Sequence, residues 1–185
     1  MRQLKVFLSI SVDGYFADER GDMSWAHADD SDFKAFVAAN AGSGNTLVMG
    51  RVTYDLMASY WPTDMAKRND PAVAAAMNEL PKIVFSRTMR EANWNNTKVL
   101  HGDAVPAMQA LKNEEGRDMV ILGSGSTARL FAEAGLVDSF QFVVVPLVLG
   151  GGRAALAGLS RRLPLTLEDS RTFKNGMVVL TYRPG

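Results

Sequence analysis

Apolar runs rich in β-branched residues alternate with segments of helical periodicity along the first three quarters of this chain. The runs fall at residues 4–10, 46–49, 82–86, 97–100 and 118–122. Parallel strands need crossover connections, and helices on both faces of the sheet usually provide them. The last quarter contains strands alone, at residues 140–149, 163–167 and 177–182, with Lys174-Asn175-Gly176 as a hairpin turn. The pattern predicts a three-layer α/β fold around a mostly parallel central sheet that ends in antiparallel strands.

We expect a single domain over residues 1–185, because a chain of this length suits one core and shows no repeat, linker or low-complexity segment. The N-terminal apolar stretch is short and carries Asp13, and no run of about 18 apolar residues occurs. Neither a signal peptide nor a membrane helix is therefore expected. The default expectation is a soluble cytoplasmic protein.

The balance of charge and the absence of cysteine exclude several classes of function. The chain carries 20 basic and 20 acidic side chains, whereas nucleic-acid-binding proteins normally have a basic surplus. It has no cysteine and two histidines, His27 and His101. Disulfides, cysteine-ligated metals and thiol nucleophiles are thereby excluded, and a histidine-rich metal site is not expected.

Capping residues predict where several helices begin. Ser31 is expected to cap the first long helix, Asp70-Pro71 to start another, and Asp103 to cap a later one. Residues 58–69 are the least regular stretch, and we expect a loop there. Within it, Tyr60-Trp61-Pro62 forms either an aromatic wall of a pocket or a hydrophobic loop on the surface.

One strand-to-helix junction contains two glycines and three hydroxyl groups. The run that ends at residue 122 is followed by Gly123, Ser124, Gly125, Ser126 and Thr127, and then by a helical pattern. Glycine lets a phosphate approach the backbone, and free N–H groups at a helix N-terminus favour an anion. A tight turn with an ordinary serine cap would use the same residues, so this motif alone leaves both interpretations open.

Two further junctions carry arginine. Gly50, Arg51 and Thr53 follow one strand, and Ser86 and Arg87 follow the next. A cation in the first turn of a helix opposes the helix dipole, so Arg51 either meets an anion such as a phosphate or points to water. Since α/β sheets bind ligands at the carboxyl ends of their strands, the three junctions together predict a ligand with more than one phosphate group.

These segments resemble the dihydrofolate-reductase-like superfamily, and most closely the reductase domain of the bifunctional deaminase-reductases of riboflavin biosynthesis, here in a stand-alone form. The likeness to dihydrofolate reductases lies in GRVTY at residues 50–54, SRT at 86–88 and GSG at 123–125. The likeness to the riboflavin enzymes lies in SVDG at residues 11–14, VD at 137–138 and PLVLGGG at 146–152. Order and spacing agree over nearly the whole chain. The zinc deaminase half is not expected, because its cysteine ligands are missing.

The resemblance implies an NADPH-dependent reductase that passes hydride to a carbon–nitrogen double bond, and it implies a homodimer. The first substrate it suggests is 5-amino-6-(5-phosphoribosylamino)uracil of riboflavin biosynthesis. A dihydrofolate-like pterin is the alternative substrate. A protein that binds NADP without catalysis is an alternative of a different class.

The resemblance also implies a role for each junction in binding NADPH. Gly50, Arg51 and Thr53 would hold the cofactor phosphates, and Arg51, Ser86 and Arg87 would surround the 2′-phosphate. Ser9 would flank the nicotinamide. The pyrophosphate would be cradled by the glycines and hydroxyls of the third junction: Gly123, Ser124, Gly125, Ser126 and Thr127.

On the substrate side, the resemblance implies that Trp25, Asp29 and Gly152 contact the substrate, with Asp30 as the catalytic acid. Either Asp29 or Asp30 suits the position of the pterin-anchoring acid, and capping of a helix explains aspartate there equally well. The chain lacks the Leu-Pro-x-Asp element of dihydrofolate reductases. It also has residues 58–64 where the riboflavin enzymes carry Asp-Asp-Pro-x-Leu. The resemblance therefore predicts the cofactor more firmly than the substrate, and it implies no metal ion.

Overall fold

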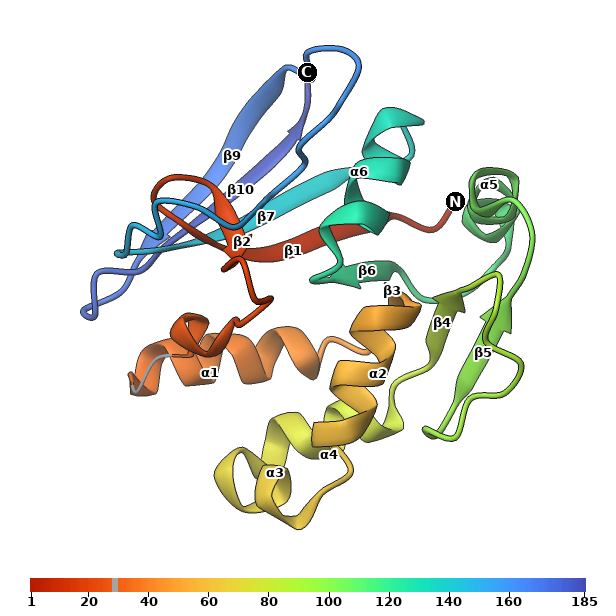
Figure 1. The fold of residues 1–185 in the computed structure, drawn as a ribbon, viewed down its shortest axis with the longest axis horizontal. Helices are drawn as coiled ribbons and strands as arrows, with labels where there is room; N and C mark the ends of the chain where they lie inside the picture. The colour runs from red at the N-terminus through yellow and green to blue at the C-terminus, as the bar shows by residue number, and fades with distance from the viewer. Residues whose placement is uncertain (28–29) are drawn as a thin grey trace.

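The computed structural model describes residues 1–27 and 30–185, and its centre is an eight-stranded sheet with the order β5-β4-β3-β6-β1-β7-β10-β9 (Figure 1). A separate two-stranded ribbon pairs β2 with β8. The strands are β1 (Leu4–Ser11), β2 (Tyr15–Ala17), β3 (Thr46–Gly50), β4 (Lys82–Phe85), β5 (Thr97–Leu100), β6 (Met119–Leu122), β7 (Ser139–Val145), β8 (Arg153–Ala154), β9 (Leu165–Thr172) and β10 (Val178–Pro184). The helices are α1 (Ser31–Ala41), α2 (Arg51–Tyr60), α3 (Asp64–Asn69), α4 (Pro71–Glu79), α5 (Ala104–Asn113) and α6 (Gly125–Glu133), with a 3-10 turn, η1 (Ser24–Ala26).

The sheet is parallel from β5 to β7, and β10 runs antiparallel to both of its neighbours. This arrangement confirms the predicted mostly parallel sheet with antiparallel C-terminal strands. Parallel pairing places the carboxyl ends of β3, β4, β5 and β6 at one edge of the sheet. The helices α2 and α6 begin at this edge, so the predicted ligand-binding junctions lie on the same side of the molecule.

Helices cover both faces of the sheet, as expected. Helices α1 to α4 lie on one face, and α5 and α6 lie on the other (Figure 1). Strand β1 shows how the alternation of side chains supplies both cores. Leu4, Val6 and Leu8 are buried in the cluster that includes α5 and α6. Phe7 points the opposite way and packs beside Phe36 of α1.

Several predicted boundaries differ from the structure for local reasons. Strand β7 ends at Val145 rather than residue 149, because Pro146 follows and cannot donate to a sheet ladder. The expected loop at residues 58–69 is wrong: α2 continues to Tyr60, and Thr63 caps α3 by accepting a hydrogen bond from the N–H of Ala66. The cap of α1 is Asp30 rather than Ser31. Among the described residues, no helix is long and apolar enough to cross a membrane. The expected pairing of two copies stays a prediction.

A buried lysine at the start of β4 connects the end of α4 to the loop before β5. Lys82 is 1% exposed. Its ammonium group donates to the carbonyl oxygens of Leu80 at 2.7 Å, Asn95 at 3.0 Å and Asn78 at 3.3 Å, and it lies 4.3 Å from the centre of the Trp94 ring. Burial lowers the pKa of Lys82 from 10.5 to about 8, because the charged form loses its hydration.

This lowered pKa predicts how stability depends on pH. Between pH of about 8 and 10.5 the unfolded chain holds the proton of Lys82 more tightly than the folded chain does, so the free energy of unfolding rises with pH across this window. Lys82→Met should remove that part of the rise, measured as urea unfolding at several pH values. Lys98→Met, an exposed lysine on β5, is the matched control and should keep the slope. An unchanged slope in Lys82→Met would show that Lys82 titrates normally.

Candidate functional site

Two helices that follow neighbouring strands begin without a side-chain cap. Strands β3 and β6 are paired in parallel, and α2 and α6 follow them directly. Within the described residues, neither helix has a side-chain hydrogen bond at its N-cap or an acidic residue in its first turn. By contrast, side chains of Asp30, Thr63 and Asp103 cap α1, α3 and α5. Helix α4 starts at Pro71 as expected, without a side-chain cap from Asp70, and proline has no N–H to satisfy there. Two uncapped N-termini side by side present N–H groups and positive dipole ends to the same space, which suits an anion.

The two junctions are in direct contact. A Cβ atom added to Gly50 would lie 3.1 Å from the hydroxyl oxygen of Thr127 and 3.3 Å from that of Ser124. These two hydroxyls are hydrogen-bonded to each other at 2.6 Å. Ser124 adopts the left-handed conformation with φ of 56°, and Gly123 has φ of 59°. The turn therefore brings its hydroxyls against the bare backbone of Gly50, and any larger residue at position 50 would crowd them.

Three strand ends lie in line at this edge. Gly50 is paired in register with Phe85, and Phe85 is paired with Leu100. The residues that follow them are Arg51, Ser86 and His101, so these three lie at the same level of the sheet. The Ser86 hydroxyl accepts hydrogen bonds from the N–H groups of Thr88 and Met89, which fixes the turn that carries the exposed Arg87.

His101 has a partner that the sequence did not reveal. Its Nδ1 lies 2.9 Å from the carbonyl oxygen of Ser86, so the imidazole connects the ends of β5 and β4. From the sequence, His101 was assigned no contact. No sequence pattern predicts this hydrogen bond, since it depends on the parallel register of two strands.

Arg51 begins α2 and already has an anionic partner. Its Nη1 lies 3.3 Å from a carboxylate oxygen of Asp55, and both side chains are 52% exposed. The unfavourable position of a cation in the first turn is thus offset by an acid one turn later. The i, i+4 spacing of Arg51 and Asp55 is visible in the sequence, and it was the signal that could have predicted this pair.

Strand β1 extends beyond the point where β6 leaves the sheet. The pairing of β1 with β6 stops at Phe7, whereas its pairing with β7 continues to Ser11. Ser9 therefore has no strand partner on the β6 side among the described residues. By the alternation of the strand, Ser9 faces the same side as Phe7, toward α1. This gap at the centre of the sheet lies beside the turn at Gly123, whose N–H donates to the carbonyl of Phe7 at 3.3 Å.

Two of the residues expected on the substrate side, Trp25 and Asp30, lie on the α1 side of this gap. Trp25 of η1 is half-buried against the cluster of Phe33 and Val143, and its indole N–H donates to the carbonyl of Asp22. Asp30 accepts the N–H of Phe33 at 2.8 Å as the N-cap of α1. This bond shows the capping role of Asp30; its catalytic role stays a prediction. Asp29 lies outside the described residues.

The ribbon of β2 and β8 covers the N-terminus of α6. The loops beside this ribbon are joined by Asp13, through contacts that the sequence did not predict. The Asp13 carboxylate accepts hydrogen bonds from the Ser11 hydroxyl and from the N–H groups of Leu149 and Gly150. These bonds hold the pKa of Asp13 below its ordinary value, the Ser11 bond most strongly. They connect the loop after β1 to the loop after β7.

Phe16 on this ribbon lies directly against the glycine-rich turn. An added Cβ at Gly125 would lie 2.5 Å from Cε1 of Phe16. Gly152, an expected substrate contact, lies against the backbone of β2, where an added Cβ would clash with the carbonyl oxygen of Ala17. Gly152 thus lets the two strands of the ribbon meet, while its contact with a substrate stays a prediction.

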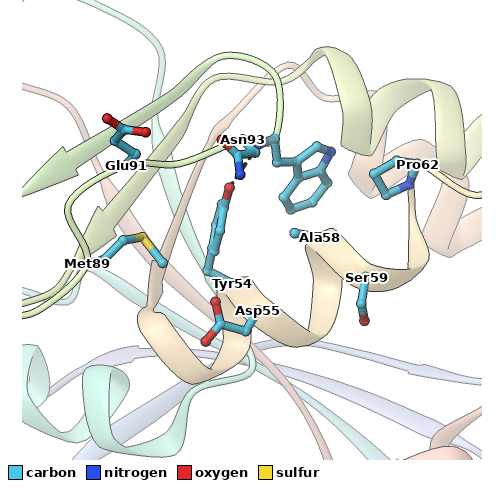
Figure 2. Close-up of a pocket in the computed structure, with 9 residues that line it drawn as sticks. Tyr54, Asp55, Ala58, Ser59, Pro62, Met89, Glu91 and Asn93 are labelled. Atoms are coloured by element: carbon cyan, nitrogen blue, oxygen red, sulfur yellow. Dashed lines mark hydrogen bonds between the residues drawn. The ribbon is translucent and has the colours of Figure 1, made fainter.

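A cavity of about 530 Å³ lies between α2 and the loop that joins β4 to β5 (Figure 2). Asp55, the partner of Arg51, lines it. Of the segment Tyr60-Trp61-Pro62, which was expected as a possible pocket wall, Pro62 lines this cavity, whereas Trp61 packs on the core. The lining residues are Tyr54, Asp55, Ala58, Ser59, Pro62, Met89, Glu91, Asn93 and Trp94. Across the described residues, no group of three or more His, Cys, Asp or Glu side chains could hold a metal ion.

The close approach at Gly152 predicts that Gly152→Ala opens the ribbon. Gly150→Ala is the matched control, because Gly150 also has a positive φ but has nothing within 4 Å of an added Cβ. We expect amide hydrogen exchange in residues 14–17 to rise about tenfold more in Gly152→Ala than in the control, since only the first variant adds a clash to the backbone strain. Equal exchange in both variants would assign the effect to backbone strain alone.

Comparison with known proteins identifies the family of this chain. A family model described as the RibD C-terminal domain matches residues 2–179. The uncharacterized protein YyaP of Bacillus subtilis is 28% identical over 182 residues, which cover 98% of this chain and 94% of YyaP. A putative riboflavin biosynthesis protein from Shewanella sp. PV-4 is 26% identical, covers 99% of both chains and superposes with a TM-score of 0.75.

A dihydrofolate reductase from Enterococcus faecalis, in complex with NADP(H) and RAB-propyl, shares the fold. It superposes with a TM-score of 0.67 at 17% identity and covers 99% of this chain and 96% of that chain. The predicted dihydrofolate-reductase-like architecture is therefore confirmed. Since the family model spans nearly the whole sequence, the chain belongs to the RibD C-terminal domain family.

Proposed function

We propose that this protein is an NADPH-dependent reductase that acts on a small heterocyclic or ribosylamine substrate. The observation that carries the proposal is the contact between two uncapped helix N-termini, where Gly50 lies against the hydroxyls of Ser124 and Thr127. A dinucleotide brings phosphates that such a site would bind. The family membership and the NADP(H) complex of a reductase with the same fold support this cofactor.

The residues present fit the cofactor. The N–H groups at the start of α6 and the hydroxyls of Ser124, Ser126 and Thr127 would bind the pyrophosphate. Thr53 of α2 lies close to this turn, since an added Cβ at Gly123 would be 3.8 Å from its methyl group. Arg51, Ser86 and Arg87, at two adjacent strand ends, would bind the 2′-phosphate.

The nicotinamide would enter the gap beside β1, next to Ser9. The bound cofactor would supply hydride to a carbon–nitrogen double bond of the substrate. The protein would orient the two molecules and exclude water, with the ribbon and its Phe16 closing one side. Asp30 is the proposed proton donor in its protonated form, through the carboxyl oxygen that is not bonded to the Phe33 N–H.

The substrate class that we propose first is the ribosylaminopyrimidine of riboflavin synthesis. The Shewanella protein, which is similar over 99% of both chains, is described as a putative riboflavin biosynthesis protein. Steady-state oxidation of NADPH with this substrate and with dihydrofolate, followed by absorbance, tests the choice. Turnover of dihydrofolate alone would favour the pterin alternative. Binding of NADPH without turnover of either compound would contradict both substrates.

The 2′-phosphate role predicts the effect of removing Arg51. Arg51→Ala should weaken NADPH binding by about tenfold while changing NADH binding by less than about twofold, because only NADPH carries the additional phosphate. Isothermal titration of both cofactors measures the two constants. Arg183→Ala is the control, since Arg183 pairs with Glu168 on β9 at the opposite end of the sheet. Equal losses for NADPH and NADH in Arg51→Ala would contradict the role.

A further inference from the structure

Asp55, the ion-pair partner of Arg51, is the basis of an inference about cofactor choice. This inference rests on the proposed function. Arg51 is the first residue of α2, and Asp55 follows one turn later on the same face. The two side chains form an ion pair of 3.3 Å with half of each side chain exposed. The guanidinium that would bind a 2′-phosphate is thus held by a carboxylate before any cofactor arrives.

A phosphate and Asp55 would compete for the same donors. The guanidinium has its N–H groups in one plane, and a bidentate bond to a phosphate uses two of them. Because Asp55 engages Nη1, a phosphate that uses this atom must displace the carboxylate, and one that binds the remaining N–H groups lies beside its negative charge. The exposed position of the pair keeps the bond weak enough to be exchanged.

The surroundings of Asp55 add to this competition. Asp55 and Glu91 line the same cavity from two elements, α2 and the loop after β4 (Figure 2). Arg87 is exposed at the end of β4 and adds positive charge at the level of Ser86. The Asp55 carboxylate beside Arg51 disfavours a dianionic phosphate, whereas an uncharged ribose 2′-hydroxyl can donate to a carboxylate.

We propose that Asp55 is a specificity-determining residue that limits the preference of this protein for NADPH over NADH by holding Arg51. Arg51 favours the phosphorylated cofactor, and Asp55 reduces that advantage. The ratio of the two affinities therefore depends on the pair rather than on the arginine alone. Removing the charge of Asp55 releases the guanidinium and strengthens the preference.

The test is a double-mutant cycle of Asp55→Asn and Arg51→Ala, with the dissociation constants of NADPH and NADH measured by isothermal titration. Asp55→Asn should tighten NADPH about three- to tenfold and leave NADH unchanged or weaker. In the Arg51→Ala background the same substitution should change NADPH binding by less than about twofold, because the released group is absent. Thermal unfolding of each variant verifies that it is folded.

Asp64→Asn is the matched control, because Asp64 forms a comparable exposed pair with Lys67 on α3 at 3.3 Å. An unchanged NADPH:NADH ratio in Asp55→Asn overturns the proposal. A gain of the same size with and without Arg51 overturns the route through the guanidinium. Failure of the wild-type protein to bind either cofactor would instead contradict the proposed function, so the two failures are distinguishable.

Discussion

The parallel pairing of β3 with β6 is the constraint on which the site depends. Because both strands end at the same edge, the two helices that follow must begin side by side, with their dipoles pointing the same way. Unsatisfied N–H groups at buried helix ends are costly. The chain caps three other helices with side chains and starts α4 with Pro71, which removes one N–H, whereas α2 and α6 have neither device. The left-handed Ser124 and the bare Gly50 then bring the two ends into contact.

The two ends of the proposed site are built in different ways. The phosphate end consists of strand ends and helix starts, whose positions are fixed by the register of the sheet. The substrate end consists of loops: η1, the start of α1 and the ribbon of β2 and β8. Asp13 holds part of that end by bonding two loops that are 136 residues apart in sequence. Loops vary more readily than sheet edges, so family members can keep a cofactor site while the substrate changes.

This division also explains what the sequence could predict. Strand β5 at Thr97–Leu100 and the Asp103 cap were predicted correctly, because their signals are local: β-branched residues and a capping residue. The junctions at Gly50 and Gly123 were located correctly for the same reason. The loop expected at residues 58–69 proved to be the end of α2, a short turn and α3, since the cap at Thr63 was not recognised.

Contacts across the fold escaped prediction. Phe16 against Gly125, and His101 bonded to Ser86, join residues that only the tertiary structure brings together. The choice of Ser31 as the cap of α1 shows a different limit: Asp30 and Ser31 both suit an N-cap, and only the backbone geometry selects one. The ion pair of Arg51 and Asp55 was readable from its spacing, but spacing does not show whether an exposed pair forms.

The net charge of zero says little about affinity for a phosphate, because screening limits each charge to its neighbourhood. At physiological salt the Debye length is about 8 Å, so a bound phosphate would respond mainly to charges at one edge of the sheet. At that edge, Arg51 and Arg87 favour a phosphate, whereas Asp55 opposes it. The local difference between these groups, and not their sum over the chain, sets the field at the strand ends. Redistributing acids around α2 would therefore tune the choice between cofactors while the fold and the total charge stayed the same.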